Sequence, residues 1–315
     1  MRVFRDETGD DAQTARLPND ARGAVWAIGN FDGLHRGHRA LLTRAWALAR
    51  ERHALAGVLT FTPHPARTLN PELAPPLILT EDEKEVGLAE LGMDLMVALR
   101  FDARLAAMSA EVFCLGVLGQ RLGALGVVVG EGFRFGHRAQ GTVDDLRRTV
   151  SFVDVVPAVK QGDLVCSSTK VRELVLEGRV DAAALVLGSP YFLSGTVVQG
   201  DMRGRTIGIP TANLETRREL LPKVGVYATV AVLEDGRRVP SVTNIGLRPT
   251  FQTGKLTEGV RIETHLLDFE GDLYEQNIRV ELLSRIRDEM RFPGPRALVE
   301  QIHKDIEVAR RVVSL

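Results

Sequence analysis

The 315-residue chain contains few cysteines and no long hydrophobic runs, and each shortage excludes a class of protein. Its two cysteines, Cys114 and Cys166, cannot form a disulfide framework, and their spacing suggests no metal site. No apolar run approaches the length of a membrane span, and the first twenty residues lack the apolar stretch of a signal peptide. We therefore expect a cytoplasmic protein with no membrane partner.

The chain also lacks an excess of charge of either sign. It has 40 Lys and Arg residues against 41 Asp and Glu residues, which gives a formal net charge of -1. Nucleic-acid-binding proteins normally carry a basic excess, so we expect no nucleic-acid partner. Only six of the basic residues are lysines. This preference for arginine indicates a bias of genome composition, and a single Arg is weak evidence of a phosphate contact.

The order of predicted elements divides the chain into two parts. Between Ala24 and about Phe152, apolar strand-like runs alternate with helix-like runs, which predicts an α/β domain with a doubly wound parallel sheet. Two short helices follow, and Gly188-Ser189-Pro190 then breaks the pattern. The predicted strands are 25–28, 56–61, 95–99 and 127–129, and the predicted helices are 39–50, 81–91, 110–122, 172–178 and 181–187.

The sequence pattern of the remainder of the chain predicts short strands separated by Gly and Pro turns. This texture predicts a small antiparallel β-barrel, in which a turn at residues 234–236 forms a hairpin. Pro295 suits a first helical position, so a terminal helix should begin there, with an apolar face that includes Ile306 and Ala309. The predicted strands are 194–199, 225–233, 239–245, 261–267 and 278–286. We expect two domains, 1–187 and 188–315.

The first informative motif is GNFDGLHRGH at residues 29–38. It joins a predicted strand to a predicted helix, and in a parallel sheet helix N-termini at this position present N–H groups and a positive dipole end to anions. Gly29, Gly33 and Gly37 would let the backbone come close to a phosphate. His35 and His38, three residues apart, should face the same side and donate hydrogen bonds to phosphate oxygens. Two such histidines could also bind zinc, although no third ligand is obvious.

This motif resembles the HxGH-type nucleotidyltransferase signature, in the form found in the prokaryotic bifunctional riboflavin kinase/FAD synthetase family. The similarity continues through LTFTPHP (59–65), LTEDEK (79–84), VVVGEGFRFG (127–136) and SSTKVRELVLEGRV (167–180). It implies an adenylylation site in which Phe133 contacts the flavin. It also implies that the nucleotide is bound by Gly29, Phe31, Asp32, Ser167, Ser168, Thr169 and Arg172. Taken alone, SSTKVRE equally predicts an N-cap followed by a surface helix.

The second motif is GRTIGIPTANL at residues 204–214. Glycines recur every four residues from Gly200, but the neighbouring β-branched residues and Pro210 disfavour a helix, so a strand–loop–strand around phosphates is the better interpretation. The segment resembles the riboflavin kinase signature, with PTAN at 210–213. The resemblance implies that Gly204 and Gly208 contact the nucleotide and that Thr211 and Asn213 hold a magnesium–nucleotide complex. In isolation, PTAN could also be a simple turn.

The block RIETHLLDF at residues 261–269 supplies the candidate base. Alternation places Ile262, Thr264 and Leu266 on one face of a strand, and Glu263 and His265 on the other. By resemblance, Glu263 takes the proton from the riboflavin 5′-hydroxyl, although an exposed residue on a barrel strand would fit the pattern equally well. SVTNIGLRPTF (241–251) and IRDEMRF (286–292) also look like blocks of the family, and Arg287 and Phe292 of the latter should border the flavin.

Together these features predict a bifunctional enzyme that uses ATP and Mg²⁺. It would convert riboflavin to FMN and FMN to FAD. The alternative is a flavin-binding or regulatory protein in which only one of the two domains is catalytically active. Gly132 departs from the family pattern, which usually has Asn or Asp before the Phe of this block. The departure implies weaker flavin binding at the adenylylation site. The sequence predicts no oligomeric state.

Overall fold

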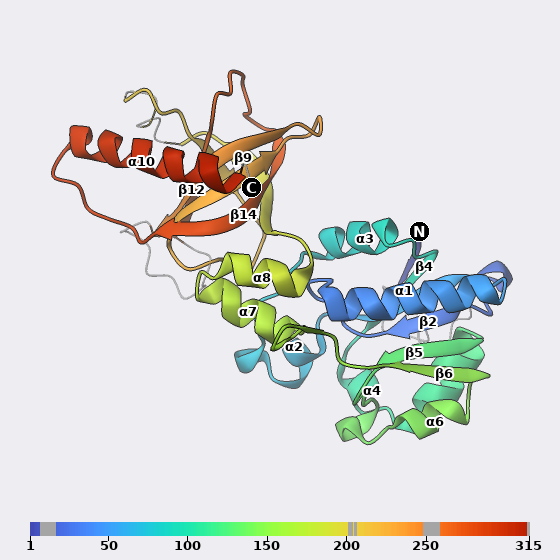
Figure 1. The fold of residues 1–315 in the computed structure, drawn as a ribbon. Coiled ribbons are helices and arrows are strands. Elements are labelled where there is room, and N and C mark those ends of the chain that lie inside the picture. Colours follow the sequence, from blue (N-terminus) through green and yellow to red (C-terminus); the bar gives the residue numbers. More distant parts are fainter. Residues whose placement is uncertain (7–16, 201–203, 205–206, 248–258, 314–315) are drawn as a thin grey trace. The chain divides into compact units, whose positions relative to one another are not determined.

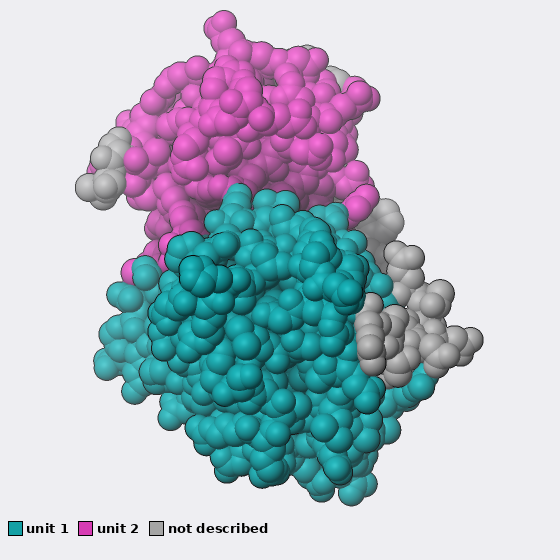
Figure 2. Space-filling model, turned by 90° about the vertical axis from the view of Figure 1, so that its right-hand side faces the viewer, with its two compact units in different colours: residues 1–75, 81–166 teal, residues 76–80, 167–315 magenta. Residues whose placement is uncertain are grey.

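The computed structural model describes residues 1–6, 17–200, 204, 207–247 and 259–313. The chain divides into two compact units (Figure 2), one of residues 1–75 and 81–166 and one of residues 76–80 and 167–315. No helix among these described residues is long and apolar enough to cross a membrane.

Unit 1 is built on a six-stranded, all-parallel sheet, as the alternating pattern predicts. The strand order is β1-β4-β3-β2-β5-β6. The strands are β1 (Arg2–Arg5), β2 (Val25–Ile28), β3 (Ala56–Thr62), β4 (Leu95–Arg100), β5 (Gly126–Gly130) and β6 (Phe152–Val156). The sequence analysis did not predict the partly buried edge strands β1 and β6; β1 has only two apolar residues between arginines, whereas the apolar run of β6 was an available signal.

The helices of unit 1 connect these strands, and their caps explain where they begin. Helix α1 (Arg36–Glu51) starts three residues before the predicted position because the His35 side chain accepts a hydrogen bond from the backbone N–H of His38. The predicted helix 110–122 is the short α5 (Ala110–Val112), continued by the π-helix η3 (Phe113–Arg121). The remaining elements are η1 (Asn19–Ala21), α2 (Pro65–Leu69), η2 (Pro71–Leu73), α3 (Glu81–Glu90), α4 (Ala103–Ala106), η4 (His137–Ala139), α6 (Val143–Arg147) and the hairpin strands β7 (Lys160–Gln161) and β8 (Leu164–Val165).

Unit 2 contains a closed antiparallel barrel, which confirms the second prediction (Figure 1). Helices α7 (Ser168–Leu176) and α8 (Val180–Leu187) precede it, and α8 ends at Gly188, whose φ of +86° is the left-handed conformation that glycine adopts readily. The barrel strands, in spatial order, are β10 (Ala212–Glu215), β13 (Val260–Leu266), β12 (Arg238–Leu247), β11 (Gly225–Val232), β14 (Asn277–Arg287) and β9 (Tyr191–Val198). The expected hairpin joins β11 to β12, with Gly236 at φ +84°.

Helix α10 (Pro295–Val313) begins at the predicted proline and packs on β11, β12 and β14. Its Ala309 is buried against Val226, Ala228 and Val242, with Ile306 beside them. The apolar stripe of the helix therefore covers the outer face of one side of the barrel.

One segment from the first half of the chain is part of unit 2. Residues 76–80 are hydrogen-bonded there, from Arg172 Nε to the Pro76 carbonyl at 2.8 Å and from Arg218 to the Ile78 carbonyl. The Leu77 N–H donates to the Glu219 carboxylate at 2.9 Å. After Cys166 the chain belongs to unit 2 for the rest of its length, so α7 and α8 are grouped with the barrel. The division of the two activities at residues 187 and 188 stays a proposal.

Candidate functional sites

The strand order of unit 1 indicates where one candidate ligand site lies. Strand β2 has β3 on one side and β5 on the other, so the direction of strand addition reverses between β2 and β5. In open α/β sheets, ligands bind at such a switch point, beyond the carboxyl ends of the strands. The motif at residues 29–38 follows β2, and the block ending in FRFG follows β5. Both sequence motifs therefore meet at the expected crevice.

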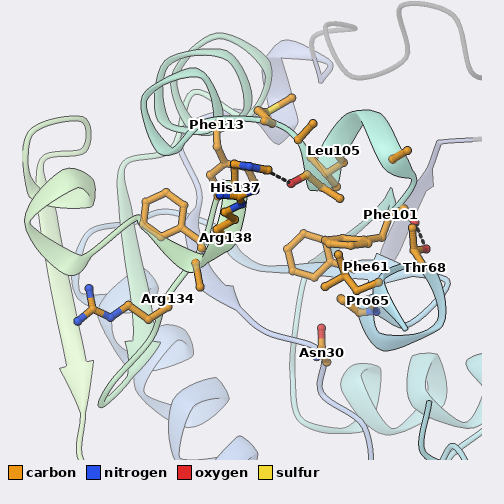
Figure 3. Close-up of a pocket in the computed structure, with 18 of the residues that line it drawn as sticks. Asn30, Phe61, Pro65, Thr68, Phe101, Leu105, Phe113, Arg134, His137 and Arg138 are labelled. Atoms are coloured by element: carbon orange, nitrogen blue, oxygen red, sulfur yellow. Dashed lines mark hydrogen bonds between the residues drawn. The ribbon is translucent and has the colours of Figure 1, made fainter. Parts of the chain in front are cut away.

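A pocket of about 850 Å³ lies at this end of the sheet (Figure 3). Its lining is mainly apolar, and the loops after β2, β3, β4 and β5 all contribute to it. The rings of Phe133 and Phe135 are stacked with centroids 5.7 Å apart, and Phe61 and Phe101 meet edge to face at 5.7 Å. The polar and charged groups on its lining include Asn30, Thr68, Arg134, His137 and Arg138. This composition suits a flat aromatic ligand that carries a polar or anionic tail.

His35 and His38 face the same side, as their spacing predicts. Their rings stack with centroids 3.7 Å apart, and Nδ1 of His35 accepts a hydrogen bond from the His38 N–H at 3.3 Å. Burial, and then the proximity of His35, lower the pKa of His38 well below its ordinary value. Within the described residues, the buried Nδ1 atom of His38 has no hydrogen-bond partner. His38 is therefore a neutral imidazole that offers one N–H.

The other residues of this motif serve the turn itself. Phe31 is fully buried with φ +52°, and its ring meets that of His38 at 5.2 Å. A Cβ on Gly29 would lie 3.3 Å from the Phe31 ring, and one on Gly37 would lie 3.0 Å from the His35 ring. Gly33 has φ +94°, and Asp32 is buried. Gly29 thus leaves room for the Phe31 ring, and Gly37 leaves room for the Cys166 carbonyl, 2.9 Å from a Cβ built there, and for the His35 ring.

Two further residues at this crevice were not singled out from the sequence. Asn30 lines the pocket, and its Nδ2 atom lies 3.4 Å from Nε2 of His64. Nδ1 of His64 caps α2 by accepting a hydrogen bond from the Ala66 N–H at 3.2 Å. In the sequence, the position of His64 directly before a proline that begins a helix was the feature that could have indicated this capping role. His64 of the loop after β3 therefore lies beside Asn30 of the motif after β2.

The segment expected to bind a triphosphate forms the start of α7, in unit 2. Ser167 is the N-cap, and its hydroxyl accepts a hydrogen bond from the Lys170 N–H at 3.2 Å. Ser168 and Thr169 lie in the first turn. Arg172 directs its Nε to the Pro76 carbonyl, so this side chain also holds the 76–80 segment. The N-cap interpretation of SSTKVRE is thus correct, and a phosphate-binding role stays a proposal.

The candidate kinase site lies on the wall of the barrel. Strand register places Asn213 of β10 and Asn244 of β12 directly opposite Glu263 of β13, one on each side. Directly opposite residues in antiparallel strands share a face. Ile262, Thr264 and Leu266 are buried while Glu263 is partly exposed, which confirms the predicted alternation. Arg261 Nε lies 3.4 Å from the Glu263 carboxylate. Asn244 was not singled out from the sequence, because strand pairing alone brings it there.

The PTAN residues lie against two glycines. A Cβ on Gly200 would overlap the Asn213 amide, and one on Gly204 would overlap the Ile209 carbonyl and lie 3.4 Å from the Thr211 hydroxyl. The Gly204 carbonyl accepts hydrogen bonds from the N–H groups of Ile207 and Ile209 at 3.2 and 2.9 Å. Gly208 has φ +78°. Strands β9 and β10 thus flank a loop, as expected, although residues 201–203, 205 and 206 of it lie outside the described residues.

The proposed ligands fit a magnesium–nucleotide complex. The space that a Cβ would fill at Gly200 and Gly204 keeps the chain close to the Asn213 amide and the Thr211 hydroxyl. Both side chains supply neutral oxygen donors, which suit a hard cation that retains water and phosphate ligands. A small pocket of about 90 Å³ adjoins Thr211 and is also lined by Phe269, Asp272 and Tyr274.

Of the two residues expected to border the flavin in unit 2, Arg287 is bonded to α10. Arg287 forms a forked pair with Asp305, with Nε and Nη2 at 3.0 and 2.8 Å from its oxygens. The Arg287 guanidinium lies 5.8 Å from the centre of the Phe292 ring. Arg287 is therefore fixed to the terminal helix, which limits how far it can turn toward a ligand. The block at 241–251 is described only as far as Leu247.

Comparison with known proteins matches each half of the chain to a different protein family. A riboflavin kinase family model matches residues 187–313, and a FAD synthetase family model matches residues 17–170. The bifunctional riboflavin kinase/FMN adenylyltransferase of Escherichia coli K12 is 40% identical over 300 residues, covering 93% of this chain and 94% of that protein. The corresponding protein of Bacillus subtilis is 36% identical over 300 residues, covering 92% and 93%.

A solved structure from Streptococcus pneumoniae, named as a macrolide-efflux protein, shares the fold of both units. Its TM-score is 0.86 with 30% sequence identity, and the match covers 98% of this chain and 99% of that one.

Proposed function

Because the chain belongs to the bifunctional riboflavin kinase/FMN adenylyltransferase family, we propose that its two activities are divided between residues 188–315 and residues 1–187. The chain phosphorylates riboflavin to FMN and adenylylates FMN to FAD, with ATP as the donor in both reactions. The kinase belongs to the barrel and the adenylyltransferase to the parallel α/β domain. We further propose that the enzyme works in the cytoplasm, where ATP and riboflavin are available.

In the kinase reaction, Glu263 acts as the base. It accepts the proton of the riboflavin 5′-hydroxyl as that oxygen attacks the γ-phosphorus of ATP, and ADP leaves as the β–γ bridging bond breaks. Asn213 and Asn244 lie directly opposite Glu263 on the two neighbouring strands, so their polar side chains share its face. The register of these three strands therefore supports the assignment of Glu263 as the proton acceptor.

Thr211 and Asn213 hold the magnesium–nucleotide complex in this proposal. When bound, Mg²⁺ neutralises charge that develops on the transferred phosphoryl group. Gly200 and Gly204 leave the space beside these two oxygen donors, and Gly208 has the positive φ that glycine adopts readily. Phe292 and the fixed guanidinium of Arg287 border the flavin.

In the adenylylation reaction, no protein nucleophile is needed. A phosphate oxygen of FMN attacks the α-phosphorus of ATP, and pyrophosphate leaves as the α–β bridging bond breaks. His35 and His38 donate hydrogen bonds to the phosphate oxygens as charge develops on them, and Gly29, Phe31 and Asp32 fix the turn that carries both rings. The neutral state of His38 suits a donor that need not lose a proton.

The aromatic pocket beside this motif receives the flavin. Phe133 and Phe135 offer stacked ring faces to the isoalloxazine, and Arg134 and Arg138 supply positive charge for the FMN phosphate. A second segment at the start of α7 binds phosphate in this proposal, through Ser167, Ser168, Thr169 and Arg172. The support is the family resemblance and the N-terminal position of the hydroxyls on α7.

The observation that carries the kinase proposal is the pairing of Glu263 with Asn213 and Asn244 across three strands. The direct test is incubation with riboflavin, ATP and Mg²⁺, followed by separation of riboflavin, FMN and FAD. Wild-type enzyme should accumulate both products, Glu263→Gln should leave riboflavin unconverted, and His38→Ala should stop at FMN. Accumulation of FAD at the wild-type rate by either variant would refute the role given to that residue.

A further inference from the structure

His265 makes a contact that the activity assigned to its strand does not explain. It lies on β13 two residues after Glu263, and therefore on the same face. Nδ1 of its imidazole is 2.7 Å from the carbonyl oxygen of Pro210. A carbonyl can only accept, so the ring donates through Nδ1–H. The strand that carries the proposed base is thus tied by a side chain to the first residue of PTAN.

This contact supports a part of PTAN that strand pairing does not. The ladder between β10 and β13 is formed by Ala212 with Thr264 and Asn213 with Glu263, and Pro210 and Thr211 precede β10. Proline has no N–H, so its carbonyl is the backbone group through which this residue can be hydrogen-bonded. Fixing that carbonyl fixes the peptide plane that leads into Thr211. On the other side of the same short segment, the N–H groups of Ile207 and Ile209 donate to the Gly204 carbonyl.

We propose that His265 is a positioning residue of the kinase, which through Nδ1–H holds the Pro210–Thr211 peptide so that the Thr211 hydroxyl faces the nucleotide phosphates. The inference rests on the proposed nucleotide-binding role of Thr211 and Asn213. Two residues of strand β13 then act on the two reactants. Glu263 accepts the proton of the attacking hydroxyl, and His265 positions the segment that holds ATP.

The competing role for a histidine so close to the base is proton transfer. The geometry separates the two roles, because a positioning residue needs only an N–H at Nδ1, whereas a proton acceptor needs a titratable ring. The amide nitrogen of Asn occupies nearly the place of Nδ1, and that of Gln nearly the place of Nε2. Neither amide accepts a proton at neutral pH. Substitution by Asn and by Gln therefore gives a matched pair.

The experiment compares His265→Ala, His265→Asn and His265→Gln in the full chain, with His303→Ala on the exposed face of α10 as the control. For each, kcat and KM of riboflavin phosphorylation are measured with ATP varied at saturating Mg²⁺. His265→Ala should raise KM for ATP about three- to tenfold, the range for loss of one hydrogen bond, and lower kcat because the phosphates are less well oriented. His265→Asn should return both constants to within about twofold of wild type, and His265→Gln should resemble His265→Ala.

Three results would overturn the proposal. They are wild-type constants in His265→Ala, failure of His265→Asn to recover activity, and recovery by His265→Gln rather than Asn. The thermal unfolding midpoint of residues 167–315 carrying each substitution, compared with the unsubstituted fragment, shows whether the barrel that contains His265 is folded. Thr211→Ala tests the underlying site separately: if it leaves KM for ATP unchanged, the nucleotide site is wrongly assigned, whatever the His265 variants do.

A measurement on the unmutated enzyme keeps the proposal testable even if the variants fold poorly. Nitrogen-15 NMR of histidine-labelled protein distinguishes a protonated Nδ1 from an unprotonated one. The His265 ring, assigned by the signal absent from His265→Asn or by its coupling to neighbouring protons, should carry its proton at Nδ1. A ring with an unprotonated Nδ1 would contradict the hydrogen bond to Pro210.

Discussion

The rings of His35 and His38 stack with their centroids 3.7 Å apart, while Nδ1 of His35 accepts the N–H of His38 that begins α1. Because Nδ1 of His35 is an acceptor, a neutral His35 carries its proton on Nε2. The cap thus sets the tautomer of the first histidine, while burial, and then the proximity of His35, lower the pKa of the second. One local contact fixes the start of a helix and the hydrogen-bonding state of a proposed active site.

Adenylylation should depend on His38 and phosphorylation should not. Removing one preorganised donor typically costs about 10²-fold or more in rate, so His38→Ala should slow conversion of FMN to FAD by that factor. Riboflavin phosphorylation should stay near the wild-type rate because its residues lie on the barrel. Both rates are measured by chromatographic separation of the flavins, with His303→Ala as control. Equal loss of both activities would contradict the division of the two sites.

The low pKa of His38 predicts loss of stability in acid. Its pKa is lowered in the folded protein by burial and by His35, whereas the unfolded chain titrates near the ordinary value of 6.5. Below that pH the unfolded state binds more protons, so the free energy of unfolding should fall as pH decreases from about 6.5 toward the lowered pKa. The thermal midpoints of wild type and His38→Asn, compared between about pH 5 and 8, test this. Parallel curves would show that His38 does not contribute.

The kinase should depend on the carboxylate of Glu263. Glu263→Gln keeps the shape and removes the proton acceptor, so FMN formation should fall by about 10²–10⁴-fold. FAD formation from supplied FMN should continue. Glu270→Gln, an exposed residue of the same unit, is the matched control. If Glu263→Gln phosphorylates riboflavin as fast as Glu270→Gln, another group is the base.

Gly132→Asn should tighten FMN binding in the adenylylation reaction. Gly132 has φ +76°, a conformation that Asn tolerates better than most residues, and a Cβ there would meet nothing within 4 Å. An added hydrogen bond predicts that KM for FMN falls by several-fold to about tenfold. Gly132→Ala carries the same backbone cost without the polar group and should not improve binding. An unchanged or higher KM in a folded Gly132→Asn would refute the idea that the missing side chain limits affinity.

A barrel fragment should be more stable when α7 and α8 are included. Helix α8 packs on β9 and β14, and the Lys223 N–H donates to the Val175 carbonyl at 3.3 Å. A fragment of residues 188–315 is expected to fold and phosphorylate riboflavin, since it contains the closed barrel. Residues 167–315 should unfold at a higher temperature, by about 5 °C or more. Equal midpoints would show that the two helices add no stability, and an inert, insoluble short fragment would show that the barrel requires them.

Local patterns in the sequence sufficed for the fold class and for most elements. Apolar runs alternating with helical stretches predicted the parallel sheet, and short strands with turns predicted the barrel. The alternation around Glu263 correctly identified which side chains of β13 are buried. These features could be predicted because side-chain periodicity follows directly from the geometry of one strand or one helix.

Contacts between distant segments were decided by the tertiary structure alone. Nothing near Asn244 in the sequence indicates that it lies opposite Glu263, because that depends on the register of two separate strands. The bond from His265 to Pro210 spans 55 residues, and the buried Arg218 finds its carbonyl partner at Ile78, 140 residues away. The sequence by itself therefore determined which motifs the protein carries and on which elements they lie. Packing and strand register, which sum over many remote residues, decided which side chains meet.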